Sequence, residues 1–172
     1  MNETLSTLLT RRSCRAYSAK QVDEATLQEI LQAGLYAPSG MGKQTAIFVV
    51  VQDPDEVAYL SKLNAAVMGT DTDPFYGAPT VIVVLADSSS YTCVEDGSLA
   101  MGNLMNAAYA LGVDSCWIHR ARPIFDSDEG KALLKKWGVE GPYIGIGHCV
   151  LGYREGELKD PAPRKENRVF RP

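Results

Sequence analysis

The longest helical pattern in the sequence, at residues 91–111, is the feature that most limits how the chain can fold. Its larger apolar residues recur at helical spacing, and Gly and Ala occupy many of the remaining positions: Gly97, Ala100, Gly102, Ala107, Ala108 and Ala110. Small side chains let a second helix approach closely. The pattern therefore predicts either a central packing helix or the seam of a dimer, and Gly112 is the expected residue just beyond its end.

Four short runs rich in β-branched residues predict the strands, at 47–51, 79–86, 113–118 and 143–153. Apolar residues at helical spacing predict further helices at 2–9, 24–36, 55–68 and 126–137. For the helix at 24–36 we expect Asp23 as the N-cap, with Val22 packed on Leu27. The connections are too irregular for a doubly wound sheet, so the sequence predicts an α+β fold in a single domain, residues 1–172.

The overall charge excludes several classes of function. A net charge of −4 leaves no general basic face for nucleic acid or for a membrane surface. The sequence has no apolar run long enough to span a bilayer and no secretory leader, so we expect a cytoplasmic protein. The four cysteines form no C-x-x-C pair and only two histidines accompany them, so no metal site is predicted.

The cysteines are expected to be buried free thiols in a reducing compartment. Cys116 lies three residues before His119, which leaves a thiol nucleophile as one interpretation. Packing of a small side chain is the favoured one.

A basic stretch at residues 11–15 stands out against this acidic background. It places three guanidinium groups and a hydroxyl within five residues: Arg11, Arg12, Ser13 and Arg15. Arginine presents a planar fork of donors that suits phosphate or another anionic oxygen. A phosphate cradle and a solvated turn paired with surface acids are both open at this point. A second basic cluster at Arg164, Lys165 and Arg168 and a polar glycine loop at 38–44 favour the cradle.

Four segments, in order along almost the whole chain, resemble the nitroreductase family of FMN-dependent oxidoreductases. The first is residues 11–17, which are similar to R-R-S-x-R-x-[YF], and the second is residues 37–44, similar to A-P-S-x-x-N-x-Q. The third combines Gly77-Ala78-Pro79, Glu95-Asp96 and the stretch from Gly112 to Trp117. The fourth is Leu151-Gly152-Tyr153 with the late basic cluster.

The resemblance implies a homodimer with two FMN molecules at the subunit interface. It also implies a mainly antiparallel sheet between helices, and a C-terminal arm, residues 154–172, that embraces the partner. Arg11 and Ser13 would hold the FMN phosphate and ribityl chain with Arg12 close by, and Arg15 would lie near the flavin N1–C2 oxygen, where a cation raises the reduction potential. The other implied cofactor contacts are Pro38, Ser39, Gly40 and Gln44 from the second subunit, Asn64, the segment Cys116, Trp117, Ile118 and His119, and Arg164, Lys165 and Arg168 at the phosphate.

The activity implied is hydride transfer from NADH or NADPH to flavin N5 and then, in a ping-pong cycle, to a nitroaromatic, quinone or similar flat electrophile. No side chain need act as a catalytic group. The sequence departs from the family pattern at Gly42, where Asn is usual, and at Thr45-Ala46, where Pro-Trp is common. Other flavin chemistry, such as reductive dehalogenation or flavin fragmentation, and a flavin-binding module without turnover are therefore alternatives.

Overall fold

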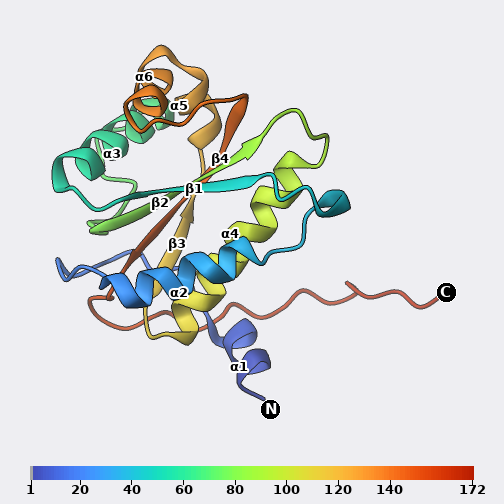
Figure 1. Cartoon of the computed structure of the whole chain (residues 1–172). Coiled ribbons are helices and arrows are strands. Elements are labelled where there is room, and N and C mark those ends of the chain that lie inside the picture. Colours follow the sequence, from blue (N-terminus) through green and yellow to red (C-terminus); the bar gives the residue numbers. More distant parts are fainter. Residues whose placement is uncertain (1) are drawn as a thin grey trace.

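A four-stranded antiparallel sheet lies between two layers of helices in the computed structural model, which describes residues 2–172 (Figure 1). The strands are β1 (Ala46–Val51), β2 (Thr80–Asp87), β3 (Asp114–Ile118) and β4 (Tyr143–Gly152), and their order in the sheet is β1-β2-β4-β3. The helices are α1 (Glu3–Thr10), α2 (Glu24–Leu35), α3 (Pro54–Met68), α4 (Cys93–Ala110), α5 (Ala121–Asp126) and α6 (Asp128–Lys136), with a short 3₁₀ turn η1 (Gly40–Gly42). The predicted α+β class and antiparallel sheet are confirmed.

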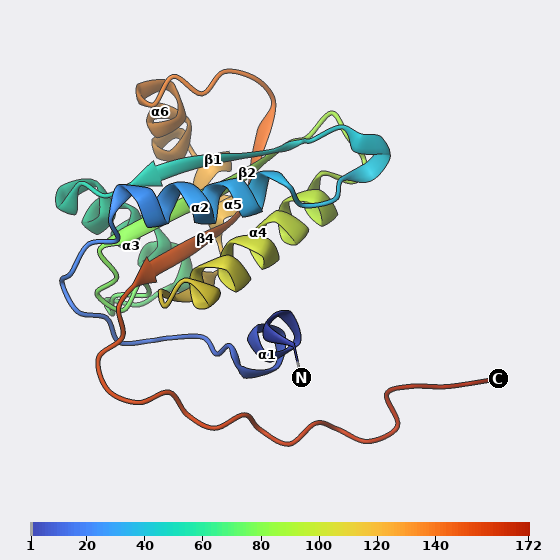
Figure 2. The ribbon, with the colours of Figure 1, turned by 60° about the horizontal axis from the view of Figure 1, so that its bottom comes forward.

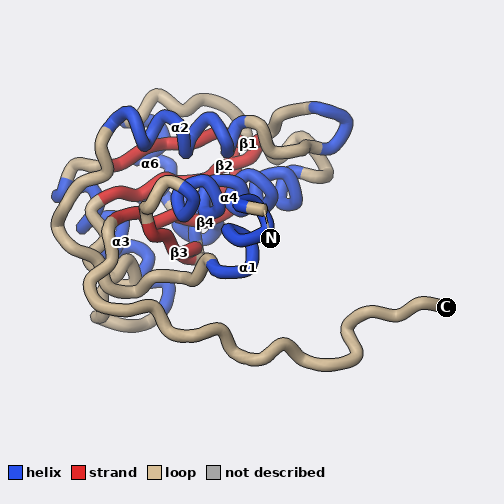
Figure 3. The backbone as a smooth tube through the Cα atoms, turned by 90° about the horizontal axis from the view of Figure 1, so that it is seen from below, coloured by secondary structure: helices blue, strands red, loops and turns tan. Residues whose placement is uncertain are grey.

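Each face of the sheet is covered by its own group of helices. Helices α2 and α4 pack on one face, and α3, α5 and α6 cover the other (Figures 1 and 3). The central strand β2 is buried at every position from Thr80 to Ala86, because alternate side chains enter opposite layers. Only the edges, ends and connections of the strands remain accessible for chemistry.

The helix ends follow the sequence closely. The Asp23 carboxylate accepts a hydrogen bond of 3.0 Å from Thr26 N–H, and Val22 and Leu27 are buried in the same apolar cluster. Gly112 has a φ of 77° just after α4, a conformation that glycine adopts without strain. The expectations for the start of α2 and for the end of α4 are confirmed.

The segment 119–137 differs from the prediction. A single helix was expected at 126–137, but the structure has α5 before it and begins α6 at Asp128. Ser127 separates the two helices: its backbone is extended, its N–H donates to the Ile124 carbonyl, and its hydroxyl accepts from Gly130 N–H. Pro123 lies in the first turn of α5, where the missing N–H costs no intrahelical bond.

The two ends of the chain contact the body least. Helix α1 has no buried residue, and residues 155–172 form an extended, largely exposed segment (Figures 1 and 2). Val169 and Phe170 in this segment are each 81% exposed. Whether this segment is an arm on a partner stays a prediction. No helix among the described residues is long and apolar enough to cross a membrane.

The junction between α5 and α6 has no room for a side chain at Gly130. A Cβ atom there would lie 2.0 Å from the Ile124 carbonyl oxygen, which is a backbone atom and cannot rotate away. We expect Gly130→Ala to lower the free energy of unfolding by about 1–3 kcal/mol, measured by urea denaturation. Lys131→Ala, an exposed change in the same helix, is the control and should stay within about 0.5 kcal/mol. Equal stability of both variants would contradict the close contact.

Candidate functional site

The basic stretch lies along the outer edge of β3. Ser13 forms an isolated parallel bridge with Ser115, and the Cys14 N–H donates to the Ser115 carbonyl at 3.0 Å. Three residues after Cys14, Tyr17 is buried and bridges to Arg154, the residue before the C-terminal segment. The backbone between Ser13 and Tyr17 is therefore held at both ends, by β3 and by the residue that follows β4 closely.

The guanidinium groups of this stretch have no acidic partner within ion-pair distance in residues 2–172. Arg12 Nη1 donates to the Leu9 and Arg11 carbonyls at 2.9 and 2.7 Å, whereas Arg12 Nε and Arg11 Nη1 are buried without a hydrogen-bond partner. Arg15 is exposed. Buried donors without partners are costly. This geometry favours the anion cradle over a turn neutralised by surface acids.

A cavity of about 570 Å³ opens beside these donors. One wall is the basic stretch, and the other is the start of the C-terminal segment, including Glu157, Lys159 and Arg164. The structure thus brings Arg11, Arg12, Ser13, Arg15 and Arg164 around one space. Lys165 and Arg168 are exposed and do not line it.

Cys116 is buried behind the basic stretch, at 3% exposure. Burial raises the pKa of its thiol, and the opposing effects of the Arg15 charge, a hydrogen bond with Ser13 and the Arg11 charge are smaller. A thiol with a raised pKa stays protonated and is a weak nucleophile. All four cysteines are buried and free. These observations support the packing interpretation.

Three predicted site residues follow Cys116 at the end of β3. Trp117 is half-buried against Gly147 of β4, where an added Cβ would lie 2.4 Å from its Nε1 atom. Ile118 is buried and His119 is exposed. The strand therefore leads from the core beside the basic stretch to an accessible turn.

Asn64 of α3 reaches this turn from the core. Its side chain is fully buried, its Nδ2 donates to the His119 carbonyl at 2.8 Å, and its Oδ1 accepts from Arg120 Nε at 2.9 Å. Nδ2 also lies 3.5 Å from His148 Nδ1. Asn64 and the end of β3 are thus brought together. Arg120 was not among the predicted site residues, and no local sequence pattern distinguishes it.

The loop at 38–44 is organised by Asp96 in the first turn of α4. The buried carboxylate accepts from Gly40 N–H and from the Thr45 hydroxyl, each at 2.8 Å. Burial raises the pKa of Asp96, but these bonds, a hydroxyl bond from Thr92 and the Lys43 charge together hold the pKa below its ordinary value of 3.8. The carboxylate therefore stays ionised and fixes the loop. The sequence had offered Asp96 only as part of a motif.

Within the loop, Gln44 N–H donates to the Ser39 hydroxyl at 2.9 Å, and Gln44 and Met41 have φ angles of 51° and 54°. The loop with Pro38, Ser39, Gly40 and Gln44 adjoins the start of α4 (Figure 1), whereas Ser115 follows the end of this helix. Since α4 has 18 residues, the two lie near opposite ends of a helix about 27 Å long. The structure does not bring this loop to the basic stretch within one chain.

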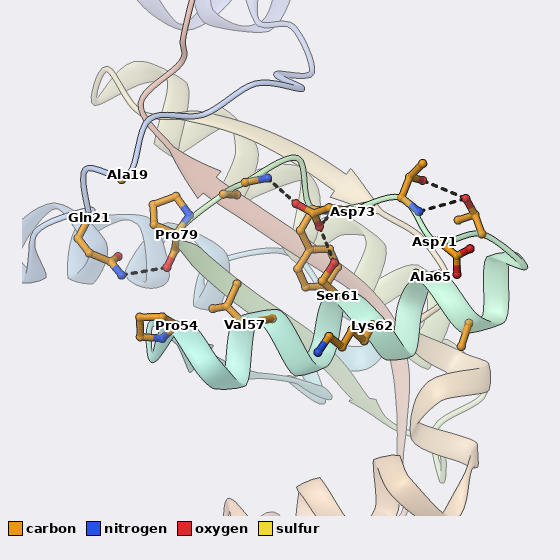
Figure 4. Close-up of a pocket in the computed structure, with 17 residues that line it drawn as sticks. Ala19, Gln21, Pro54, Val57, Ser61, Lys62, Ala65, Asp71, Asp73 and Pro79 are labelled. Carbon is orange, nitrogen blue, oxygen red and sulfur yellow. Dashed lines mark hydrogen bonds between the residues drawn. The ribbon is translucent and has the colours of Figure 1, made fainter.

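A larger cavity, of about 910 Å³, lies between α3 and the segment 70–79 (Figure 4). Its most prominent polar group is already engaged, because the Asp73 carboxylate accepts from Ser61 Oγ at 2.5 Å and from the N–H groups of Phe75 and Gly77 at 2.8 and 2.6 Å. None of the predicted site residues lines it. Its walls are mostly apolar, which makes it a poor match for an anionic ligand.

Comparison with known proteins matches residues 8–70 and 69–153 to the family model described as Nitroreductase family. A protein of Archaeoglobus fulgidus named as an NADH dehydrogenase/NAD(P)H nitroreductase is 33% identical over 91% of this chain and 88% of its own length. The crystal structure of a nitroreductase with bound FMN from Bacteroides fragilis superposes with a TM-score of 0.90, at 32% identity over 99% of this chain and 98% of that one. An FMN-dependent nitroreductase from Clostridium difficile gives 0.88, at 25% identity over 99% of each chain.

His148 is a titratable group buried within the fold. It is fully buried, lies against the rings of Phe75 and Phe125 with centroids 5.2 and 6.1 Å away, and has no partner for Nε2. Burial, helped by the Arg120 charge and opposed by backbone carbonyls, lowers its pKa from 6.5 to about 4. The histidine is neutral in the folded protein near pH 7.

This lowered pKa predicts a pH dependence of stability. Between pH 6.5 and 4 the unfolded chain binds a proton at His148 that the folded chain does not, so stability falls as the pH falls. We expect His148→Gln to remove a slope of up to about 1.4 kcal/mol per pH unit in this window, measured by urea denaturation. Above pH 7 the two slopes should coincide. Parallel curves at every pH would contradict a buried neutral histidine.

Proposed function

The chain belongs to the nitroreductase family, and on that premise we propose that it is an FMN-dependent oxidoreductase that uses NADH or NADPH as electron donor. The observation that carries the proposal is the pair of buried, unpaired guanidinium donors of Arg11 and Arg12 beside the cavity. A phosphate group with two negative charges would satisfy these donors. The acids that line the same cavity, Glu155, Glu157 and Asp160, form no ion pair with Arg11 or Arg12 among residues 2–172. The relatives that are described with bound FMN support the same ligand.

The donor set at this cavity fits the phosphate end of FMN. Arg11, Arg12 and Ser13 provide charged and hydroxyl donors, and Ser13 is fixed by its bridge to β3. Arg164 lines the opposite wall. We assign the phosphate and ribityl chain to these residues, with Lys165 and Arg168 as further contributors from the C-terminal segment.

The flavin ring would lie along the end of β3, from Cys116 through Trp117 and Ile118 to His119. When bound, FMN supplies two-electron chemistry, taking a hydride from the nicotinamide and passing it to a nitroaromatic, quinone or similar flat acceptor. Arg15 places a permanent positive charge near the ring and favours the form that carries negative charge. The other side chains bind and orient, which agrees with a protonated Cys116 and with the neutral His148 in the core.

A second copy of the chain completes the proposed site. Within one chain the loop of Pro38, Ser39, Gly40 and Gln44 and the basic stretch lie near opposite ends of α4, a helix about 27 Å long, so the loop would serve the flavin of the partner. Large apolar side chains are exposed on α1, at the end of α2 and on α4: Leu5, Leu8, Leu9, Leu35, Tyr36, Val94 and Leu99. A surface of this kind is typical of an interface between subunits. The C-terminal segment would then extend over the partner.

The direct test is the visible spectrum of the purified protein. We expect a yellow protein whose flavin absorbance is bleached by NADH or NADPH under nitrogen and restored by a quinone or nitroaromatic. Colourless protein that takes up no added FMN would overturn the proposal. Reduction by dithionite but by neither nicotinamide would point to other flavin chemistry, and reduction without turnover on any acceptor would indicate a binding module.

The two arginines at the ends of the basic stretch should act differently. Arg11→Ala removes a charged donor from the phosphate and should weaken FMN affinity by about tenfold or more, measured by quenching of FMN fluorescence. Arg15→Ala should lower the flavin reduction potential, measured against reference dyes, more than it weakens binding. Arg122→Ala, which changes an exposed arginine outside the cavity, is the control. Equal potentials in Arg15→Ala and the parent would remove that assignment.

A further inference from the structure

A small polar network stands within the apolar layer beneath the end of β3. Asn64 comes from α3, His148 from β4, and Arg120 from the turn that joins β3 to α5. Asn64 and His148 are fully buried, and the aromatic rings of Phe75 and Phe125 flank the histidine. Burying polar side chains among apolar ones is costly unless their hydrogen bonds are satisfied. Asn64 offsets this cost through its hydrogen bonds to the turn after β3.

One carboxamide holds two consecutive residues of the turn. Asn64 Nδ2 donates to the His119 carbonyl at 2.8 Å, and Asn64 Oδ1 accepts from Arg120 Nε at 2.9 Å. A trans peptide is planar, with its C=O and N–H pointing in opposite directions. Because the His119 carbonyl is held toward the buried Asn64, the N–H of Arg120 must point the other way, out of the core.

The backbone at Arg120 also indicates that the turn is held under strain. Arg120 has a φ of 75°, a left-handed conformation that residues other than glycine adopt at a cost. None of the turn, cap and side-chain hydrogen bonds among residues 2–172 is donated by its N–H. Such a conformation persists when surrounding contacts fix it, and here the Arg120 side chain is tied to Asn64.

We propose that Asn64 and Arg120 are positioning residues, which hold the His119–Arg120 peptide so that the end of β3 presents one fixed backbone surface to the flavin ring. This inference rests on the proposed function, because it takes the ring to lie along residues 116–119. It assigns Asn64 a role through the turn, since both ends of its carboxamide are already engaged. Arg120 has an indirect role as well, because its side chain donates to Asn64 and so holds the carboxamide that fixes the turn.

The sharpest variant is Arg120→Gly. Glycine accepts the left-handed backbone, so the fold should survive, while the bond to Asn64 is lost. We expect faster hydrogen–deuterium exchange in the peptide spanning residues 116–122 of the flavin-free protein. In the FMN-loaded protein we expect the rate of bleaching by NADH to fall about tenfold, with a shifted reduction potential and FMN affinity close to that of the parent. Arg120→Lys retains a donor and should recover most of the rate.

The control and the contrary outcomes separate this inference from the proposed function. Arg122→Ala changes an exposed arginine two residues away and should alter none of these quantities. Unchanged exchange in Arg120→Gly would overturn the inference, as would faster exchange with an unchanged rate and potential. A parent protein that binds no FMN would overturn the proposed function instead, and the exchange measurement would still show whether the network holds the turn.

Discussion

Burial of the sheet on both faces is the constraint from which the rest of this structure follows. Side chains of β2 enter both helical layers, and β4 is buried at every position from Ile144 to Gly152. A strand in this position has no surface to offer a ligand. The chemistry is therefore restricted to places where the layers end: the outer edge of β3, the turn after it, and the loop before β1.

At the β3 edge, burial of the sheet also determines where positive charge is placed. The edge would otherwise expose unpaired backbone groups, and the Ser13–Cys14 segment covers it by pairing with Ser115. The same pairing places Arg11 and Arg12 against the body of the protein. There, one nitrogen of each guanidinium is buried without a hydrogen-bond or ion-pair partner. The pairing that covers the strand edge is therefore also the pairing that brings the two arginines to the cavity.

The sequence predicted the features of the fold that depend on neighbouring residues. The Asp23 cap, Gly112 after α4 and the β-branched strands depend on neighbouring residues, and each was found as expected. The break at Ser127 was missed because one residue both ends α5 and begins α6. The bonds that join Asn64 to the turn after β3 and Asp96 to Gly40 span 55 or 56 positions of the sequence, so only the fold reveals them. The family resemblance supplied the remaining site residues, because their spacing alone does not place them together.

The length of α4 explains why the 38–44 loop and the basic stretch lie apart within one chain. The helix holds the 38–44 loop through Asp96 at its start and leads to β3, which carries the basic stretch, at its end. Nothing in one chain can shorten that distance, because a helix has a fixed rise per residue. Two antiparallel copies packed along such helices would bring the start of one beside the end of the other. Gly97, Ala100 and Ala108 are buried within the chain's own fold, whereas Gly102, Ala107 and Ala110 are not. Those three small residues, which allow close approach, and the exposed leucines of α1 are what such a packing requires. The feature that limits the fold of one chain is thus also the feature that would pair it with a second.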